Sequence, residues 1–349
     1  MNNILEEDLN AIIAENLAWE KLKNKSVMLT GAGGMIGSYL LYVLLVLNDK
    51  MHYNIKVNAV VRAENKLPNE IRNRSDVNVI IADVTEKLPE TGKIDYVIHA
   101  ASPASPLIMK DHPVETIAAN TVGTFQTLQL AKAHHAQGYL FISSREIYGQ
   151  PEEGCECFDE ATYGFVDPLN PRSCYSEGKK AAETMCVSFR EEYGLNVKIA
   201  RLAHTYGPGM SIYDGRVQAD FLKNIYHRED IVLKSEGNAI RTYTYIADAV
   251  AGLYRILLNS DDVVYNIGNE NAKVSIRELA EILVGLYPEK GLKLIFDIPE
   301  GGTKGTAPYT LGILDSSKIR RLGWNPQYSI KEGFKRTLEY LEQEHVEKI

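Results

Sequence analysis

A cluster of glycines between an apolar strand and a helix constrains the fold of this chain more than any other stretch. The sequence Thr-Gly-Ala-Gly-Gly-Met-Ile-Gly, residues 30–37, follows a predicted strand at 26–30 and precedes a predicted helix at 36–48. Glycines at this spacing allow a tight turn, a close approach of the backbone to a pyrophosphate at the positive end of the helix, and close packing of that helix on the sheet. The stretch therefore predicts a dinucleotide-binding turn rather than a purely structural one. The predicted contacts are Gly31, Gly33, Gly34, Met35, Ile36 and Gly37.

Strand and helix patterns alternate after this turn as far as residue 205. Apolar runs typical of buried strands occur at 57–61, 77–81, 96–100, 140–143 and 197–202. Helical stretches at 113–135 and 175–193 separate the later runs. Apolar strands that alternate with helices are typical of a parallel sheet covered on both faces. We therefore predict a Rossmann-type, doubly wound α/β domain over residues 25–205.

The pattern changes on both sides of this domain. After residue 205, Gly, Pro, Asp and Tyr become frequent and the elements are short and mixed. This predicts a smaller C-terminal α/β part that covers the strand ends and binds substrate, formed by residues 206–241 and 269–342, while 242–268 return to the first domain. Residues 1–24 carry apolar side chains at helical spacing. They are predicted to form a helical arm that packs on the chain or contacts another subunit.

Composition and charge exclude several classes of function. The net charge of -8 and the pI near 5.6 disfavour binding to nucleic acid or to an anionic membrane. The longest apolar run, residues 39–47, is too short to span a bilayer. The acidic N-terminus does not match a secretory signal, so we expect a cytoplasmic protein. The four cysteines lack the spacing of a zinc site, so we expect reduced thiols and no metal. They are Cys155, Cys157, Cys174 and Cys186.

The ends of the second and third strands bear on the choice of cofactor. An acid that binds the adenosine ribose of NAD is expected after the second strand, but Arg62 stands there. Arg62 can contact the 2′-phosphate of NADP, or it can be a solvated loop residue. Asp83 ends the third strand, where it can reach the adenine edge or cap a turn. We expect NAD as the cofactor, with NADP left open by Arg62.

A Tyr-x-x-x-Lys motif supplies the candidate catalytic residues. Tyr175 and Lys179 lie on one face of a predicted helix, because they are four residues apart. A lysine cation beside a phenol favours the phenolate, so the tyrosine can take a hydroxyl proton near neutral pH. Ser144, at a predicted strand end, can hydrogen-bond the same hydroxyl. The alternative is an unrelated surface Tyr/Lys pair.

Together these motifs resemble the extended short-chain dehydrogenase/reductase family of nucleotide-sugar enzymes, over about residues 25–342. Within that family the similarity is closest to the UDP-glucuronate decarboxylases. The most specific matches are the Pro-Arg-x-x-Tyr motif and Asp-Gly-Arg. The matching stretches are HAASPASP (99–106), NPRSCYSEGKKAAETMC (170–186), DGRV (214–217), GNAIRTYTYIAD (237–248) and LGWNP (322–326).

The resemblance implies a reaction cycle on a UDP-linked sugar. The bound nicotinamide takes a hydride from C4 of the sugar while Tyr175 takes the proton, and the resulting 4-keto sugar loses its C6 carboxylate as CO2 before the hydride returns. This cycle converts UDP-glucuronate to UDP-xylose. The resemblance also implies a homodimer, in which helices 113–135 and 175–193 of each subunit form a four-helix bundle.

Further binding residues follow from the resemblance alone. Arg216 and Arg241 match arginines that bind the nucleotide diphosphate, a role that suits the planar guanidinium, although surface salt bridges are the alternative. The other implied cofactor contacts are Val84, Ala100, Ala101 and Ser102. The other implied substrate contacts are Ser105, Arg172 and Tyr245.

Three residues depart from the pattern of the family: Arg62, in place of the acid that selects NAD, Arg145 and His204. Glu146 keeps a carboxylate near C5 and C6 of the sugar, but Arg145 stands where the 4,6-dehydratases have a proton-donating acid, and an arginine cannot give up a proton at neutral pH. Arg145 can hold a substrate carboxylate, although tight binding would resist its loss as CO2. Otherwise it faces solvent or pairs with Glu146. His204 replaces an asparagine of the family and contacts the substrate or has a structural role.

These departures leave other functions open. A C4 or C5 epimerase and an atypical 4,6-dehydratase fit the same motifs. A non-catalytic nucleotide-binding regulatory protein is the alternative from another class. The intact Ser144, Tyr175 and Lys179 argue against it.

Overall fold

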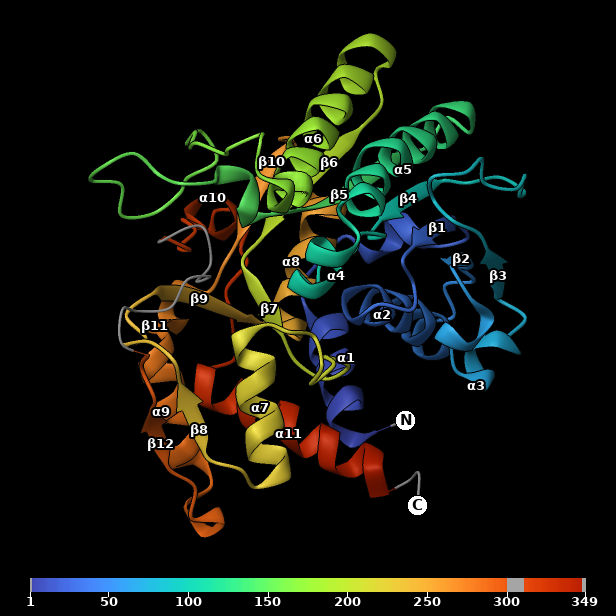
Figure 1. The fold of residues 1–349 in the computed structure, drawn as a ribbon. Helices are drawn as coiled ribbons and strands as arrows, with labels where there is room; N and C mark the ends of the chain where they lie inside the picture. The colour runs from blue at the N-terminus through green and yellow to red at the C-terminus, as the bar shows by residue number, and fades with distance from the viewer. Residues whose placement is uncertain (1, 300–310, 347–349) are drawn as a thin grey trace.

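A seven-stranded parallel sheet forms the centre of the computed structural model, which describes residues 2–299 and 311–346 (Figure 1). The strand order is β10-β6-β5-β4-β1-β2-β3. The strands are β1 (Ser26–Thr30), β2 (Lys56–Val61), β3 (Val77–Ile81), β4 (Tyr96–His99), β5 (Gly138–Ser144), β6 (Val197–Leu202) and β10 (Val264–Ile267). Because the order reverses between β1 and β4, a crevice opens at the carboxyl ends of these two strands, where such sheets bind ligands. The predicted doubly wound α/β fold is confirmed.

Helices cover both faces of this sheet, as Figure 1 shows with α5 and α6 above it and α2 and α8 below it. Alternate side chains of β1 enter two separate cores, as the period of two in a strand requires. Val27 and Leu29 lie in the core with α2 and α8, whereas Met28 lies in the core with α5 and α6. The four helices are α2 (Met35–Met51), α5 (Pro113–Ala133), α6 (Cys174–Tyr193) and α8 (Ile246–Asn259).

The glycine turn has the geometry that its sequence predicts. Gly31 has a φ of 70°, a left-handed conformation that favours glycine. A Cβ atom on Gly37, in the first turn of α2, would lie 2.0 Å from the carbonyl oxygen of Gly31. Only glycine at this position lets the helix start so close to the turn. The turn therefore presents bare backbone at the positive end of α2.

The N-terminal arm packs on the chain itself. Its helix α1 (Asn3–Ala14) contacts α2, α8 and α11 (Ile330–Val346). Leu5, Leu9 and Ile12 are buried in the same core as α2 and α8. Asp8 is fully buried on the same helix face and accepts hydrogen bonds from Tyr39 (2.9 Å), Tyr245 (2.7 Å) and Arg336 (2.7 Å).

Two small sheets and several helices form the region beside the carboxyl ends of the large sheet. The three-stranded sheet consists of β11 (Lys273–Ser275), β9 (Ile240–Tyr245) and β7 (His204–Tyr206), and the two-stranded sheet of β12 (Leu294–Phe296) and β8 (Ile231–Leu233). The remaining helices are α3 (Asn69–Arg72), α4 (Pro106–Asp111), α7 (Val217–His227), α9 (Ile276–Leu286) and α10 (Ser317–Arg320). Within residues 242–268, β10 joins the large sheet and α8 packs in its core, whereas β9 belongs to the three-stranded sheet.

None of the helices in the described part of the chain is long and apolar enough to cross a membrane.

Candidate active site

A cavity of about 500 Å³ opens at the carboxyl ends of β1, β2, β3 and β4. Its position at the strand ends is the one where such sheets bind dinucleotides. At Gly31 the cavity is lined by backbone without a side chain, because a Cβ there would lie 2.8 Å from the backbone of Ala100. Met35, Ile36 and Gly37 form the first turn of α2 beside it. The predicted cofactor contacts that line it are Gly31, Gly33, Gly34, Arg62, Asp83, Val84, Ala100, Ala101 and Ser102.

Two basic side chains and one acid line the part of this cavity next to β2 and β3. Arg62 follows β2, and Lys66, which the sequence analysis missed, lies close to the glycine turn. Asp83 accepts hydrogen bonds from the backbone amide (2.9 Å) and the hydroxyl (2.7 Å) of Thr85. These bonds lower the pKa of Asp83, and the charge of Arg62 adds to the effect. Asp83 therefore caps a turn and lines the cavity at once.

Helix α5 supplies a wall of this cavity that the sequence analysis did not identify. Val114, Glu115, Ala118 and Ala119 line it. The next residue of the helix, buried Asn120, accepts a hydrogen bond of 2.8 Å from the hydroxyl of Ser102. The spacing of Val114 and Ala118 by four residues was the available signal, because it places both on one helix face.

Ser144, Tyr175 and Lys179 come together, as their motif predicts. Ser144 ends β5 and hydrogen-bonds the phenol of Tyr175, which lies in the first turn of α6. Lys179 lies one turn later, and its ammonium donates to the carbonyl of Ile142 (2.6 Å). That ammonium is 5.8 Å from the ring centroid of Tyr175. Tyr175 and Lys179 are both buried.

Burial dominates the protonation of this group. It raises the pKa of Tyr175, as does the charge of Glu146, while the bond with Ser144 and the charges of Arg216 and Arg172 lower it. Burial also lowers the pKa of Lys179 to about 7, although Glu183 acts in the opposite direction. The lysine therefore changes charge near neutral pH.

Glu146 is held next to Tyr175 by Arg172 of the Pro-Arg-x-x-Tyr motif and by Ser176, the residue after it. Its carboxylate pairs with Arg172 (3.0 Å) and accepts a longer hydrogen bond from Ser176 (3.5 Å). The backbone amide of Glu146 donates to the hydroxyl of Ser144 (3.2 Å). Arg172, a predicted substrate contact, therefore positions a carboxylate in this structure.

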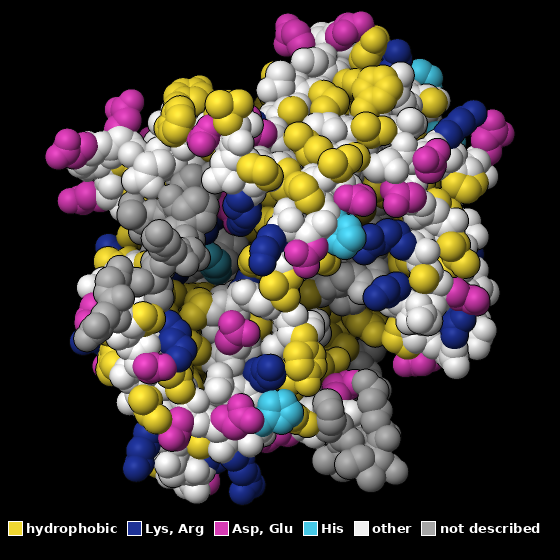
Figure 2. Space-filling model, viewed as in Figure 1, with side chains coloured by type: hydrophobic (Ala, Val, Ile, Leu, Met, Phe, Trp, Pro, Cys, Tyr) yellow, Lys and Arg dark blue, Asp and Glu magenta, His cyan; other side chains and the backbone are white. Residues whose placement is uncertain are grey.

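A second basic group lies next to Glu146. Arg145 is 7% exposed and Arg241, on β9, is 5% exposed. Neither is a surface residue, which excludes a solvent-facing Arg145 and a surface salt bridge for Arg241. A guanidinium nitrogen of Arg145 lies 3.3 Å from Nε2 of His204 on β7. Figure 2 shows basic side chains around the hollow in the middle of this face.

The loops that carry Ser105 and Arg216 are joined to each other. Ser105 donates a hydrogen bond to the carbonyl of Asp214 (2.7 Å), and Arg216 donates one to the carbonyl of Ala104 (2.8 Å). Arg216 also pairs with the carboxylate of Asp214 (3.1 Å). These bonds bring the Asp-Gly-Arg turn to the start of α4.

Tyr245 lies apart from the other predicted substrate contacts. It is 1% exposed, and its hydroxyl bonds with Asp8 and Arg336 in the packing of the N-terminal arm. Strand β9 ends by turning this side chain into the core. We therefore correct the prediction: Tyr245 has a structural position in this chain.

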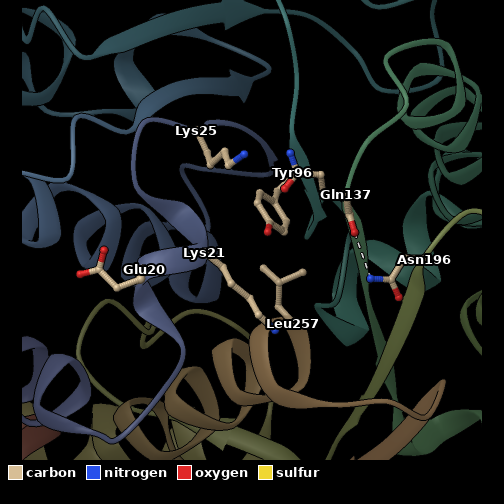
Figure 3. Close-up of a pocket in the computed structure, with 7 residues that line it drawn as sticks. All are labelled: Glu20, Lys21, Lys25, Tyr96, Gln137, Asn196 and Leu257. Atoms are coloured by element: carbon tan, nitrogen blue, oxygen red, sulfur yellow. Dashed lines mark hydrogen bonds between the residues drawn. The ribbon is translucent and has the colours of Figure 1, made fainter.

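A second cavity, of about 420 Å³, lies near the amino ends of the strands, away from these residues (Figure 3). Lys25 precedes β1, Tyr96 begins β4, and Asn196 precedes β6. Asn196 donates a hydrogen bond to the carbonyl of Gln137 (2.9 Å). None of the predicted site residues lines this cavity. Within the described residues, no group of three or more His, Cys, Asp or Glu side chains is placed to hold a metal ion.

Comparisons with known proteins identify the family of this chain. The pattern of the NAD dependent epimerase/dehydratase family matches residues 27–268. A protein of Arabidopsis thaliana named UDP-glucuronic acid decarboxylase 3 is 34% identical over 318 residues, which cover 89% of this chain and 87% of the relative. UDP-glucuronic acid decarboxylase 1 of Xenopus tropicalis is 31% identical over 321 residues, 92% of this chain and 73% of the relative.

Solved structures share the fold. The UDP-glucose 4-epimerase of Thermotoga maritima, with UDP-glucose, has a TM-score of 0.76 at 23% identity and covers 92% of this chain and 99% of its own. The UDP-glucuronic acid 4-epimerase of Bacillus cereus, in complex with UDP-glucuronic acid and NAD, has a TM-score of 0.72 at 21% identity and covers 91% and 99%. The match over residues 27–268 and the relatives at 31–34% identity show that the chain belongs to the NAD-dependent epimerase/dehydratase family.

Proposed function

We propose that this enzyme oxidises the C4 hydroxyl of UDP-glucuronate transiently and releases UDP-xylose and CO2. The observation that carries the proposal is the pairing of Ser144 with Tyr175 next to Lys179, beside the crevice of the sheet. Relatives at 30–34% identity that are named UDP-glucuronic acid decarboxylases support this substrate and reaction.

The side chains divide the work. NAD, when bound in the cavity over the glycine turn, supplies the acceptor that takes the C4 hydride and later returns it. The phenolic oxygen of Tyr175 takes the proton of the C4 hydroxyl, while the hydroxyl of Ser144 holds that group in place. Lys179, when protonated, favours the phenolate that this transfer needs. The substrate thereby becomes a ketone at C4, and the later return of the hydride makes the complete cycle redox-neutral.

The ketone makes the loss of CO2 possible. The substrate is then a β-keto acid, in which the C5–C6 bond breaks, its electron pair passes into the C4 carbonyl, and CO2 leaves. C5 takes a proton, which restores the ketone. Glu146, held by Arg172 at 3.0 Å, is the carboxylate next to Tyr175 that can exchange protons with this region. Arg216, tied to the loop of Ser105, supplies a planar fork for the diphosphate.

Arg145 favours a second candidate, the C4 epimerisation of UDP-glucuronate. A buried cation near the sugar stabilises a carboxylate, and decarboxylation removes the charge from that group. An epimerase keeps the carboxylate and returns the hydride to the other face of C4. Both candidates share C4 oxidation and the same substrate, and they differ only in their product.

A product assay separates the two candidates. The purified chain, with UDP-glucuronate and NAD, should release CO2 and form a UDP-pentose, as measured by mass spectrometry. Tyr175→Phe should lower turnover at least ~100-fold, because it removes the group that takes the proton, while the affinity for the nucleotide sugar stays the same. A uronate isomer of unchanged mass would replace the decarboxylase with the epimerase. Unchanged turnover in Tyr175→Phe would remove the catalytic assignment.

Three finer proposals complete this function. NAD is the cofactor, with NADP as a second ligand because Arg62 and Lys66 both line the cavity. The enzyme forms a homodimer through α5 and α6. It works in the cytoplasm, which its four free thiols support.

A further inference from the structure

Two arginines from different elements converge on one backbone segment. Arg145 follows β5, and Arg241 lies on β9. Between them lies Gly312, where an added Cβ would be 2.8 Å from Cδ of Arg241 and 3.6 Å from Cζ of Arg145. Thr242, next to Arg241, fixes this segment by donating a hydrogen bond to the carbonyl of Gly312 (2.8 Å). A third side chain, His204, contacts Arg145 at 3.3 Å.

The charges of this group add up to a positive region within the protein. Burial and the charge of Arg145 lower the pKa of Arg241 to about 10. Burial and the charges of Arg145, Arg241 and Arg216 lower the pKa of His204 well below its usual value, so that the imidazole is neutral. Because a guanidinium can only donate, Nε2 of His204 accepts from Arg145 and the ring proton lies on Nδ1. An anion bound here gains more than it would at the surface.

The position of Arg145 in the chain indicates which anionic group of a substrate it can bind. Arg145 directly follows Ser144, which hydrogen-bonds Tyr175. A sugar whose C4 hydroxyl meets Ser144 and Tyr175 presents its C5 and C6 atoms near C4, whereas the diphosphate on C1 leaves from the opposite end of the ring. Glu146, the next residue, already has an arginine partner in Arg172. Arg145 is therefore placed for an acidic group at C6 rather than for the diphosphate.

We infer that Arg145 is the residue that selects a carboxylate at C6 of the sugar, and that His204 is a positioning residue that orients its guanidinium. This inference rests on the proposed function, because it assumes that C4 meets Ser144 and Tyr175. It goes beyond that function in naming the side chains that separate a uronate from the neutral hexose. A UDP-hexose with a hydroxyl at C6 offers Arg145 no negative charge.

Binding measured without turnover isolates this selection. In a Tyr175→Phe background with NAD present, the dissociation constants of UDP-glucuronate and UDP-glucose are compared by calorimetry. Arg145→Ser should weaken the binding of UDP-glucuronate by about 10-fold to 100-fold, the usual value of a charge-assisted hydrogen bond. The binding of UDP-glucose should change less than about 3-fold, since it lacks the carboxylate. The selectivity ratio, not either constant alone, is the readout.

Two further variants keep the result interpretable. Arg145→Lys retains the charge and should recover most of the selectivity. His204→Asn retains Arg145 but removes its 3.3 Å contact, so it should lower the selectivity by less than Arg145→Ser does. Thermal melting identifies any variant that fails to fold. If Arg145→Ser does not fold, the selectivity ratios of Arg145→Lys and His204→Asn test the inference instead.

Each outcome has one meaning. An equal loss of affinity for both ligands in Arg145→Ser would mean that Arg145 supports the site as a whole, and it would overturn the inference. An unchanged selectivity ratio would overturn it too. If the parent protein binds neither nucleotide sugar, the proposed function fails instead, because the diphosphate is common to both ligands.

Discussion

Lys179 is the buried cation whose charge state bears most directly on the reaction. It is 3% exposed, and burial lowers its pKa from 10.5 to about 7. Between these two values the unfolded chain binds a proton that the folded chain does not. The free energy of unfolding should therefore rise with pH from 7 toward 10, as the cost of burying the charge is relieved, and the full cost is present below pH 7.

Replacing this lysine should flatten that dependence. In Lys179→Met, the increase in the free energy of unfolding between pH 7 and pH 9 should be smaller than in the parent by on the order of 1–2 kcal/mol. Urea unfolding at both pH values measures it. Lys180→Met, on the more exposed side of α6, is the matched control and should keep the increase of the parent. Equal increases in all three proteins would contradict the prediction.

Arg62 allows a second prediction, about the cofactor. Arg62→Asp should weaken the binding of NADP by about 10-fold or more, because a carboxylate repels the 2′-phosphate that the guanidinium attracts, and should affect NAD much less. Fluorescence titration with both dinucleotides measures this. Arg72→Ala is the control, since Arg72 pairs with Glu64 rather than lining the cavity. An equal loss of affinity for NAD and NADP would show that Arg62 does not bind the 2′-phosphate.

For single residues, the sequence predicted correctly those positions that depend on spacing along the chain. The glycines of the turn and the Tyr175/Lys179 pair follow from local geometry, and the structure places them as expected. The partners of long side chains could not be predicted. Arg172 engages Glu146, and Tyr245 turns into the core toward Asp8, because contacts between distant segments depend on packing that no local pattern records.

Helix α1 is the element whose contribution the sequence left most open. Its apolar face predicted packing against this chain or another, and the structure shows contacts with α2, α8 and α11. Asp8 joins the arm to the rest by accepting from Tyr39, Tyr245 and Arg336. Because Tyr245 ends β9, the strand of Arg241, the arm also anchors a strand of the candidate substrate site. The spacing of its apolar residues predicted the helix, but it did not predict that Asp8 is buried within the packing.

Removing the buried acid should destabilise the fold. Asp8→Ala removes the acceptor that Arg336 shares with the phenols of Tyr39, Tyr245 and Tyr328, so the free energy of unfolding should fall by about 3–5 kcal/mol. Urea unfolding measures the change. Glu6→Ala, an exposed acid on the same helix, should stay within about 0.5 kcal/mol of the parent. A similar, small effect of both substitutions would mean that the arm does not stabilise the fold through Asp8.

The whole molecule exposes an apolar face that a subunit interface would cover. Exposed hydrophobic side chains lie along α5 and α6, which pack against each other and are the helices predicted to form a four-helix bundle. Figure 2 shows hydrophobic side chains gathered in the upper part of the view, where these helices lie in Figure 1. Contiguous patches of this kind mark interfaces more often than single exposed residues do. The exposed side chains are Val114, Ile117, Val122, Phe125, Val187 and Tyr193.

This face predicts a dimer with twice the chain mass of 39.0 kDa, measurable by light scattering after size-exclusion chromatography. Val122→Glu should give monomers, because its charge would be buried between the paired helices at a cost of several kcal/mol. Val232→Glu is a matched control: Val122 is 42% exposed and Val232, on β8, is 41% exposed, so both changes place a carboxylate at equally accessible apolar sites. If the parent is a monomer, or if both variants dissociate alike, α5 and α6 do not form the interface.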